Sequence, residues 1–195
     1  MNNNVTNLDK TCAEFGIDLL EFFKKTYEKI NELIKSCRNL SDLRTKSYKE
    51  NGGENKKLEE FGNYSLGIIK DSLKNDNDFN KLKKKDKPLN FDSKSFETEI
   101  TKALGILVED GPFAYLIWLK SEDKEPHRAM LIQTARILQK LKLMEIDTSD
   151  DLKEKIEFSF LNEITSDLTK TLFTKTILEK MLIYARYKAK AIQHE

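Results

Sequence analysis

The side chains that most often carry out chemistry in proteins are few and scattered in this sequence. Neither of the two histidines, His127 and His194, has a second His, a Cys or a carboxylate at the spacing of a metal site. Cys12 and Cys37 do not form a CxxC pair, which argues against a zinc site or a disulfide framework and is typical of a reducing cytosol. Neither a phosphate-binding glycine loop nor a GxSxG nucleophile motif occurs. The sequence therefore predicts no metal, no cofactor and no catalytic residue.

Arg186 and His194 form the one pair that could cleave RNA. They resemble the Arg and His pair of the HEPN ribonucleases, which are also all-α proteins. The seven residues between them exceed the spacing of that motif. In addition, a histidine at the penultimate position of a fraying terminus is poorly held for acid–base catalysis. A HEPN-like ribonuclease is therefore the less favoured alternative.

The charges nearly cancel over the whole chain, but they are unevenly distributed. Among 195 residues, 34 Lys and Arg face 33 Asp and Glu, so the net charge alone predicts no polyanionic partner. Two segments, residues 126–144 and 180–193, contain no acid at all. Such a basic surface is less common than the mixed charges of an ordinary exposed helix. We therefore expect both segments to contact phosphate groups, and to converge into one groove in the folded protein.

The candidate nucleic-acid contacts come from these two segments and from a lysine-rich stretch within residues 75–90. They are Arg128, Arg136, Lys140, Lys142, Arg186, Lys188, Lys190, Lys83, Lys84 and Lys85. Helical spacing places Gln133, Arg136 and Lys140 on one face. Each of these residues could instead be an ordinary solvated charge that contacts no ligand. The lysine-rich stretch could likewise be an ordinary solvated loop.

The sign of the charge reverses in residues 145–163, which hold seven acids and two lysines. This segment is expected to form a solvated face, or to sit against a basic surface of a neighbouring subunit.

The acidic and basic segments together also allow a different class of function. The chain could be a helical adaptor that docks proteins through its acidic and basic faces and never touches nucleic acid.

Long stretches without proline or glycine predict an all-α fold, a bundle of about six to seven helices. Its centre is a helix-turn-helix corner in which Gly111 and Pro112 separate two apolar arms. The other helices are expected over residues 7–38, 56–74, 93–109, 126–143 and 166–192. The spacing in the last helix predicts these inward residues: Leu168, Leu172, Leu178, Met181, Leu182, Ala185, Ala189 and Ile192.

The predicted elements fall into two parts. Residues 1–90 hold the long first helix, the second helix and the basic loop, and residues 91–195 hold the C-terminal helical bundle. One compact domain is expected to contain both. The first ten residues lack the basic and apolar regions of a signal peptide, so we expect a cytoplasmic protein.

Two stretches carry a family resemblance. The first is EDGPFAYLIWLK at residues 109–120, and the second combines TKTILE at 174–179 with MLIYARYKA at 181–189. From about Thr98 to its end, the chain resembles the small helical subunit of type III-B CRISPR RNA-guided effector complexes. In that family an Asn-Gly corner precedes an aliphatic-aromatic-Leu helix, and a Thr-x-Glu-Ala element opens the last helix. Here Asp110 and Pro112 flank the glycine and Lys-Thr-Ile follows Thr174, so the subfamily is left open.

The resemblance implies a non-catalytic subunit that self-associates in several copies along a ribonucleoprotein. Its implied partners are guide RNA, target RNA or single-stranded DNA, and the other subunits of the effector complex, without a membrane. Contacts to phosphate bind nucleic acid without reading its sequence, so base selectivity would come from pairing with the guide.

Overall fold

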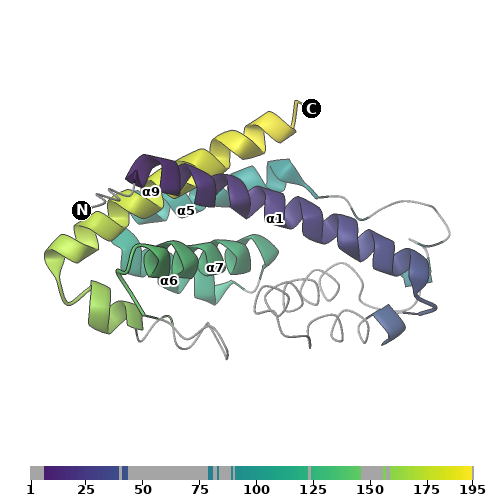
Figure 1. Cartoon of the computed structure of the whole chain (residues 1–195), viewed down its shortest axis with the longest axis horizontal. Coiled ribbons are helices and arrows are strands. Elements are labelled where there is room, and N and C mark those ends of the chain that lie inside the picture. The colour runs from purple at the N-terminus through teal and green to yellow at the C-terminus, as the bar shows by residue number, and fades with distance from the viewer. Residues whose placement is uncertain are drawn as a thin grey trace, which may run out of the picture. The chain divides into compact units, whose positions relative to one another are not determined.

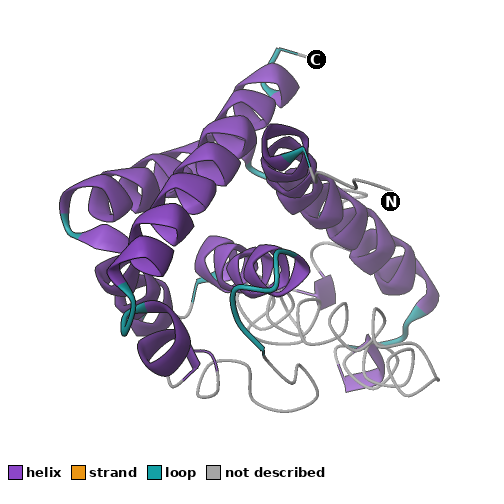
Figure 2. Cartoon of the chain, turned by 60° about the vertical axis from the view of Figure 1, so that its left-hand side comes forward, coloured by secondary structure: helices purple, strands orange, loops and turns teal. Residues whose placement is uncertain are grey.

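The computed structural model describes residues 7–39, 41–43, 79–80, 83, 89, 91–122, 124–145, 156 and 159–194. Within these residues every regular element is a helix (Figures 1 and 2), and the predicted all-α bundle is confirmed. The helix predicted over residues 56–74 and most of the lysine-rich and acidic stretches lie outside the described residues. None of the described helices is long and apolar enough to cross a membrane.

The chain divides into two compact units. One contains Met1–Leu20 and Asp92–Glu195, and the other contains Glu21–Phe91. The first helix, α1 (Leu8–Ser36), contributes its beginning to one unit and the rest to the other. The boundary predicted after residue 90 lies next to the junction at 91 and 92. A single compact domain over the whole chain stays a prediction.

The predicted helix-turn-helix corner joins α5 (Ser93–Glu109) to α6 (Gly111–Ser121). Asp92 starts α5, because its side chain accepts hydrogen bonds from the backbone N–H groups of Lys94 and Ser95 at 3.1 and 3.0 Å. Gly111 has a φ of 90°, the left-handed conformation that glycine adopts without steric cost. Pro112 then occupies the first turn of α6, where no intrahelical N–H is needed. The corner is confirmed.

The next helix, α7 (Glu125–Lys140), begins with Pro126 in its first turn, as predicted, and ends before the predicted residue 143. Its last turn closes through two backbone hydrogen bonds. The N–H of Lys142 donates to the carbonyl of Gln139 at 3.0 Å, and the N–H of Leu143 donates to that of Leu138 at 2.9 Å. This is a Schellman motif, and it places Lys142 in the left-handed region with a φ of 57°.

The last helix, α9 (Leu168–Ile192), follows a π-helical turn, η1 (Phe160–Ile164). Its N-cap is Asp167, which accepts hydrogen bonds from the N–H groups of Thr169 and Lys170. α9 packs along α5, and Figure 1 shows the two helices running beside each other. The buried apolar residues of the two helices are Phe96, Ile100, Ala103 and Leu107 in α5 and Ile177, Leu178, Met181, Leu182, Ala185 and Ala189 in α9.

Two residues predicted to face inward lie on the outside of α9. Leu168 is 74% exposed and Leu172 is 56% exposed. Leu172 and the buried Leu178 are about 1.7 turns apart, so they project to different sides of the helix. Thr174 and Ile177 take the buried positions of this part of α9 instead. The prediction for Leu168 and Leu172 was wrong because α9 is apolar on more than one side.

The beginning of α1 lies against α9 at Gly16. A Cβ atom at this position would come within 2.5 Å of the carbonyl oxygen of Met181 and within 2.9 Å of the backbone nitrogen of Ala185. Only glycine permits this approach between the two backbones. The carboxylate of Asp9 adds a polar link, because it accepts hydrogen bonds from Lys180 Nζ and Tyr184 Oη, both at 2.8 Å.

The second unit has its own core, formed by Ile30, Leu33, Ile34, Cys37, Leu43 and Phe79. The side chain of Asn31 holds the backbone of Leu89 through two hydrogen bonds, donating to its carbonyl at 2.9 Å and accepting from its N–H at 2.7 Å. Phe91 stacks near Phe23, with 6.2 Å between the ring centroids. These contacts hold residues 89–91 against the second half of α1.

Candidate nucleic-acid interface

Among the described residues, the end of α7 presents two accessible predicted phosphate contacts. Lys140 and Lys142 are both exposed, and no described carboxylate lies within ion-pair distance of either. Arg128 and Arg136 lie on the same helix but are half-buried, and each already makes an interaction inside the protein. An exposed cation without a described carboxylate beside it loses the least when it moves to a phosphate. Lys140 and Lys142 are therefore the strongest candidates.

The predicted basic face of α7 is only partly accessible. Gln133 was expected to share a face with Arg136 and Lys140, but its side chain is 3% exposed and therefore internal. α7 is buried on most of its circumference, since His127, Ala129 and Thr134 are internal in addition to its apolar residues. The accessible positive charge is concentrated at the C-terminal end of the helix.

Two of the predicted contacts on α9, Arg186 and Lys190, lie beside one carboxylate. Glu97 of α5 has its Oε1 atom 3.6 Å from Arg186 Nε and 3.7 Å from Lys190 Nζ. Its Oε2 atom accepts a hydrogen bond from Gln193 at 3.0 Å. That hydrogen bond, followed by the charges of Lys190 and Arg186, lowers the pKa of Glu97 below its ordinary value. This single carboxylate offsets one of the two positive charges of Arg186 and Lys190.

The remaining predicted contacts are less informative. Lys188 is half-buried and makes an interaction of its own. Lys83 belongs to the second unit, where its ammonium group donates to the carbonyl of Cys37 and lies 6.0 Å from the ring centroid of Phe79. Lys84 and Lys85 lie outside the described residues.

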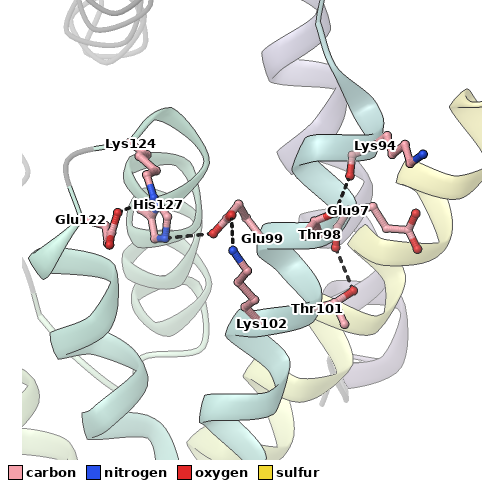
Figure 3. Close-up of polar contacts among 9 residues, drawn as sticks. All are labelled: Lys94, Glu97, Thr98, Glu99, Thr101, Lys102, Glu122, Lys124 and His127. Carbon is pink, nitrogen blue, oxygen red and sulfur yellow. Dashed lines mark hydrogen bonds and ion pairs between the residues drawn. The ribbon is translucent and has the colours of Figure 1, made fainter.

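α5 contacts α9 and the first turn of α7 through different sides. Glu97 and Glu99 are two residues apart on a helix, so their side chains project to nearly opposite sides. Figure 3 shows Glu97 directed toward α9 and Glu99 directed toward His127, in the first turn of α7. That the two acid-free segments converge into one groove stays a prediction. Glu97 could not be found from the sequence, because nothing in its spacing links it to residues 186–193.

The pair weighed for RNA cleavage shows no shared arrangement. Arg186 faces Glu97, and His194 is exposed in the turn that follows α9. Among the described residues no group of three or more His, Cys, Asp or Glu side chains could hold a metal ion. That the chain is not an enzyme stays a prediction.

α9 also carries an exposed apolar row, formed by Leu168, Leu172, Ile183 and Tyr187. Leu168 and Leu172 form one pair and Ile183 and Tyr187 another, each spaced by about one helical turn, and the two pairs lie on roughly the same side of the helix about three turns apart. Ile183 is 39% exposed and Tyr187 is 66% exposed. An exposed apolar surface of this kind marks protein–protein contacts more often than nucleic-acid contacts.

No protein-family model matches the chain, and no curated protein or solved structure matches it significantly.

Proposed function

We propose that this protein is a non-catalytic, nucleic-acid-binding subunit of a type III CRISPR interference complex, which contacts the phosphates of a single strand through the end of α7. The observation that carries the proposal is the pair of exposed lysines, Lys140 and Lys142, at the end of an acid-free segment. The family resemblance of residues 109–120 and 174–189 supplies the setting: guide RNA, target RNA or single-stranded DNA, further subunits and a cytoplasmic location.

The backbone at Lys142 supports a role for its charge. Glycine or asparagine is the usual residue at a left-handed helix end, because other side chains are strained there. A lysine with a φ of 57° keeps a positive charge at the cost of that strain. Residues held in such conformations cluster at functional sites.

Lys140 and Lys142 do not read bases in this proposal. Ammonium groups on flexible side chains bind phosphate as point charges, which stabilises any single strand equally. Arg186 and Lys190 can contact phosphate only if their ion pairs with Glu97 break, so we regard them as secondary contacts.

A protein–protein adaptor is the second candidate, and the exposed apolar row of α9 favours it. Burying these side chains against a partner removes apolar surface from water, which stabilises association at about 25 cal/mol per Å² before the costs of binding. The partner in a CRISPR complex would be another subunit or another copy of this chain.

Purification under native conditions from the host of the protein separates the two candidates. We expect RNA of defined length to co-purify, and the double variant Lys140→Glu/Lys142→Glu to lose the RNA while keeping its protein partners. The matched double variant Leu168→Ser/Leu172→Ser, also on exposed positions, is expected to keep the protein folded and to lose protein partners. Protein partners without any RNA would contradict the nucleic-acid proposal and support the adaptor.

A further inference from the structure

His127 is completely buried at the point where α5, α6 and α7 meet. Its side chain is 0% exposed, and among the described residues neither ring nitrogen has a hydrogen-bond partner. The ring of Trp118, the only tryptophan, packs edge-on against the imidazole with 4.3 Å between the centroids. A buried polar group without a hydrogen bond is costly, so this position calls for an explanation.

The charged groups around His127 have opposite effects on the protonation of its imidazole. Glu99 Oε2 of α5 is 3.4 Å from His127 Nε2, while the other carboxylate oxygen binds Lys102 Nζ at 2.7 Å (Figure 3). Glu122, just after α6, pairs with Lys124, just before α7. The two carboxylates favour a protonated imidazole, whereas the two lysines oppose it.

Protonation would place a charge where the fold accommodates it poorly. Burial lowers the pKa of His127 below its ordinary value of 6.5, and the attraction of Glu99 and Glu122 only partly offsets this. His127 also lies in the first turn of α7, the positive end of the helix dipole, where a cation is unfavourable.

We propose that His127 is a proton-controlled joint, which holds the first turn of α7 against α5 and α6 while neutral and releases that turn when it is protonated. Solvation of the imidazolium drives the release. Glu99 sets the threshold, because its Oε2 atom attracts the imidazolium while Lys102, bound to its Oε1 atom, weakens that attraction. The joint does not depend on which of the two candidate functions is correct.

Trp118 reports on this joint directly. We expect its fluorescence to change in a one-proton step whose midpoint lies below the ordinary histidine pKa of 6.5, with unchanged far-UV circular dichroism. Over the same range, hydrogen exchange should accelerate at the first turn of α7. His127→Gln should abolish the step, and the control His194→Gln, at the only other histidine, should retain it.

Two further variants test the network even if His127→Gln fails to fold. Glu99→Gln removes the attraction and should move the midpoint of the step to lower pH. Lys102→Met removes a repulsion and frees Glu99, so it should move the midpoint to higher pH. The proposal is overturned by a wild-type protein without a step, by a step that survives in His127→Gln, or by midpoints that move in the same direction in both variants.

Discussion

At the scale of single residues, Lys142 combines a strained backbone with an exposed charge. Lys142→Gly is expected to stabilise the protein by roughly 1 kcal/mol, because glycine adopts the left-handed conformation freely. The same variant should bind single-stranded RNA more weakly, since one cation is lost. Urea unfolding and filter binding measure the two effects. Lys140→Gly is the matched control: it removes the same charge from within α7 and should destabilise by roughly 0.5–1 kcal/mol.

A second prediction at this scale concerns the buried hydroxyl pair of Tyr115 and Thr134. Their oxygens are 3.0 Å apart, and burial strongly raises the pKa of Tyr115, so the phenol stays neutral. Thr134→Val leaves a buried hydroxyl without a partner and should lower the free energy of unfolding by about 1–3 kcal/mol.

The double variant Tyr115→Phe/Thr134→Val removes both partners and should recover most of that loss, because no polar group remains unsatisfied. Urea unfolding of both single variants and of the double variant measures the coupling. Additive losses would contradict the assignment of this hydrogen bond as the stabilising interaction.

The sequence was informative about the type of the site residues but not about their surroundings. It identified Lys140 and Lys142 because a run of residues without Asp or Glu can be recognised in the sequence itself. It could not show that Glu97 faces Arg186 and Lys190, because that contact joins residues about ninety positions apart. His127 was weighed only as a metal ligand, since its burial beside Glu99 and Trp118 depends on three helices meeting.

At the scale of elements, the approach of α1 to α9 depends on Gly16. Gly16→Ala is expected to destabilise the protein by at least 1–3 kcal/mol, roughly the cost of overpacking, because the new methyl group meets backbone atoms that cannot move alone. Gly105→Ala is the control. It makes the same change inside α5, where nothing lies within 4 Å, and should stabilise by roughly 0.5–1 kcal/mol. Thermal unfolding compares the two, and equal effects would contradict the close approach.

The elements that were predicted well are those with local signals. Asp92 begins α5, Gly111 and Pro112 form the corner, and the last helix starts where Asp167 caps it. Each signal acts within a few residues, so it can be recognised without knowledge of the tertiary structure. The inward side of α9 near Leu168 and Leu172 was predicted wrongly, because apolar spacing cannot choose between two apolar sides of one helix. That choice is made by the packing against α5.

At the scale of the whole molecule, acid should weaken the link between the start of α1 and α9. Hydrogen bonds from Lys180 and Tyr184 lower the pKa of Asp9 below its ordinary value of 3.8. The unfolded chain therefore takes up a proton at higher pH than the folded protein. The contribution of Asp9 to stability is complete above its ordinary pKa and is lost as the pH falls through the lowered one.

We expect Asp9→Asn to be less stable than the wild type at neutral pH and to lose less stability on acidification. Urea unfolding at a series of pH values measures both effects. Asp18→Asn, at an exposed position of the same helix, is the control and should follow the wild type. Parallel pH profiles of the wild type and Asp9→Asn would mean that the link through Asp9 does not stabilise the folded state.

The salt dependence of single-stranded RNA binding tests the proposed function most directly. If about four phosphates are contacted, a plot of log K against log salt concentration should have a slope near roughly −3, from about 0.7 per contact. Lys140→Gln/Lys142→Gln should reduce the magnitude of that slope by about 1.4, while Lys190→Gln, whose cation Glu97 already holds, should reduce it less. No binding at low salt, or a slope unchanged by the double variant, would contradict a phosphate-binding role for the end of α7.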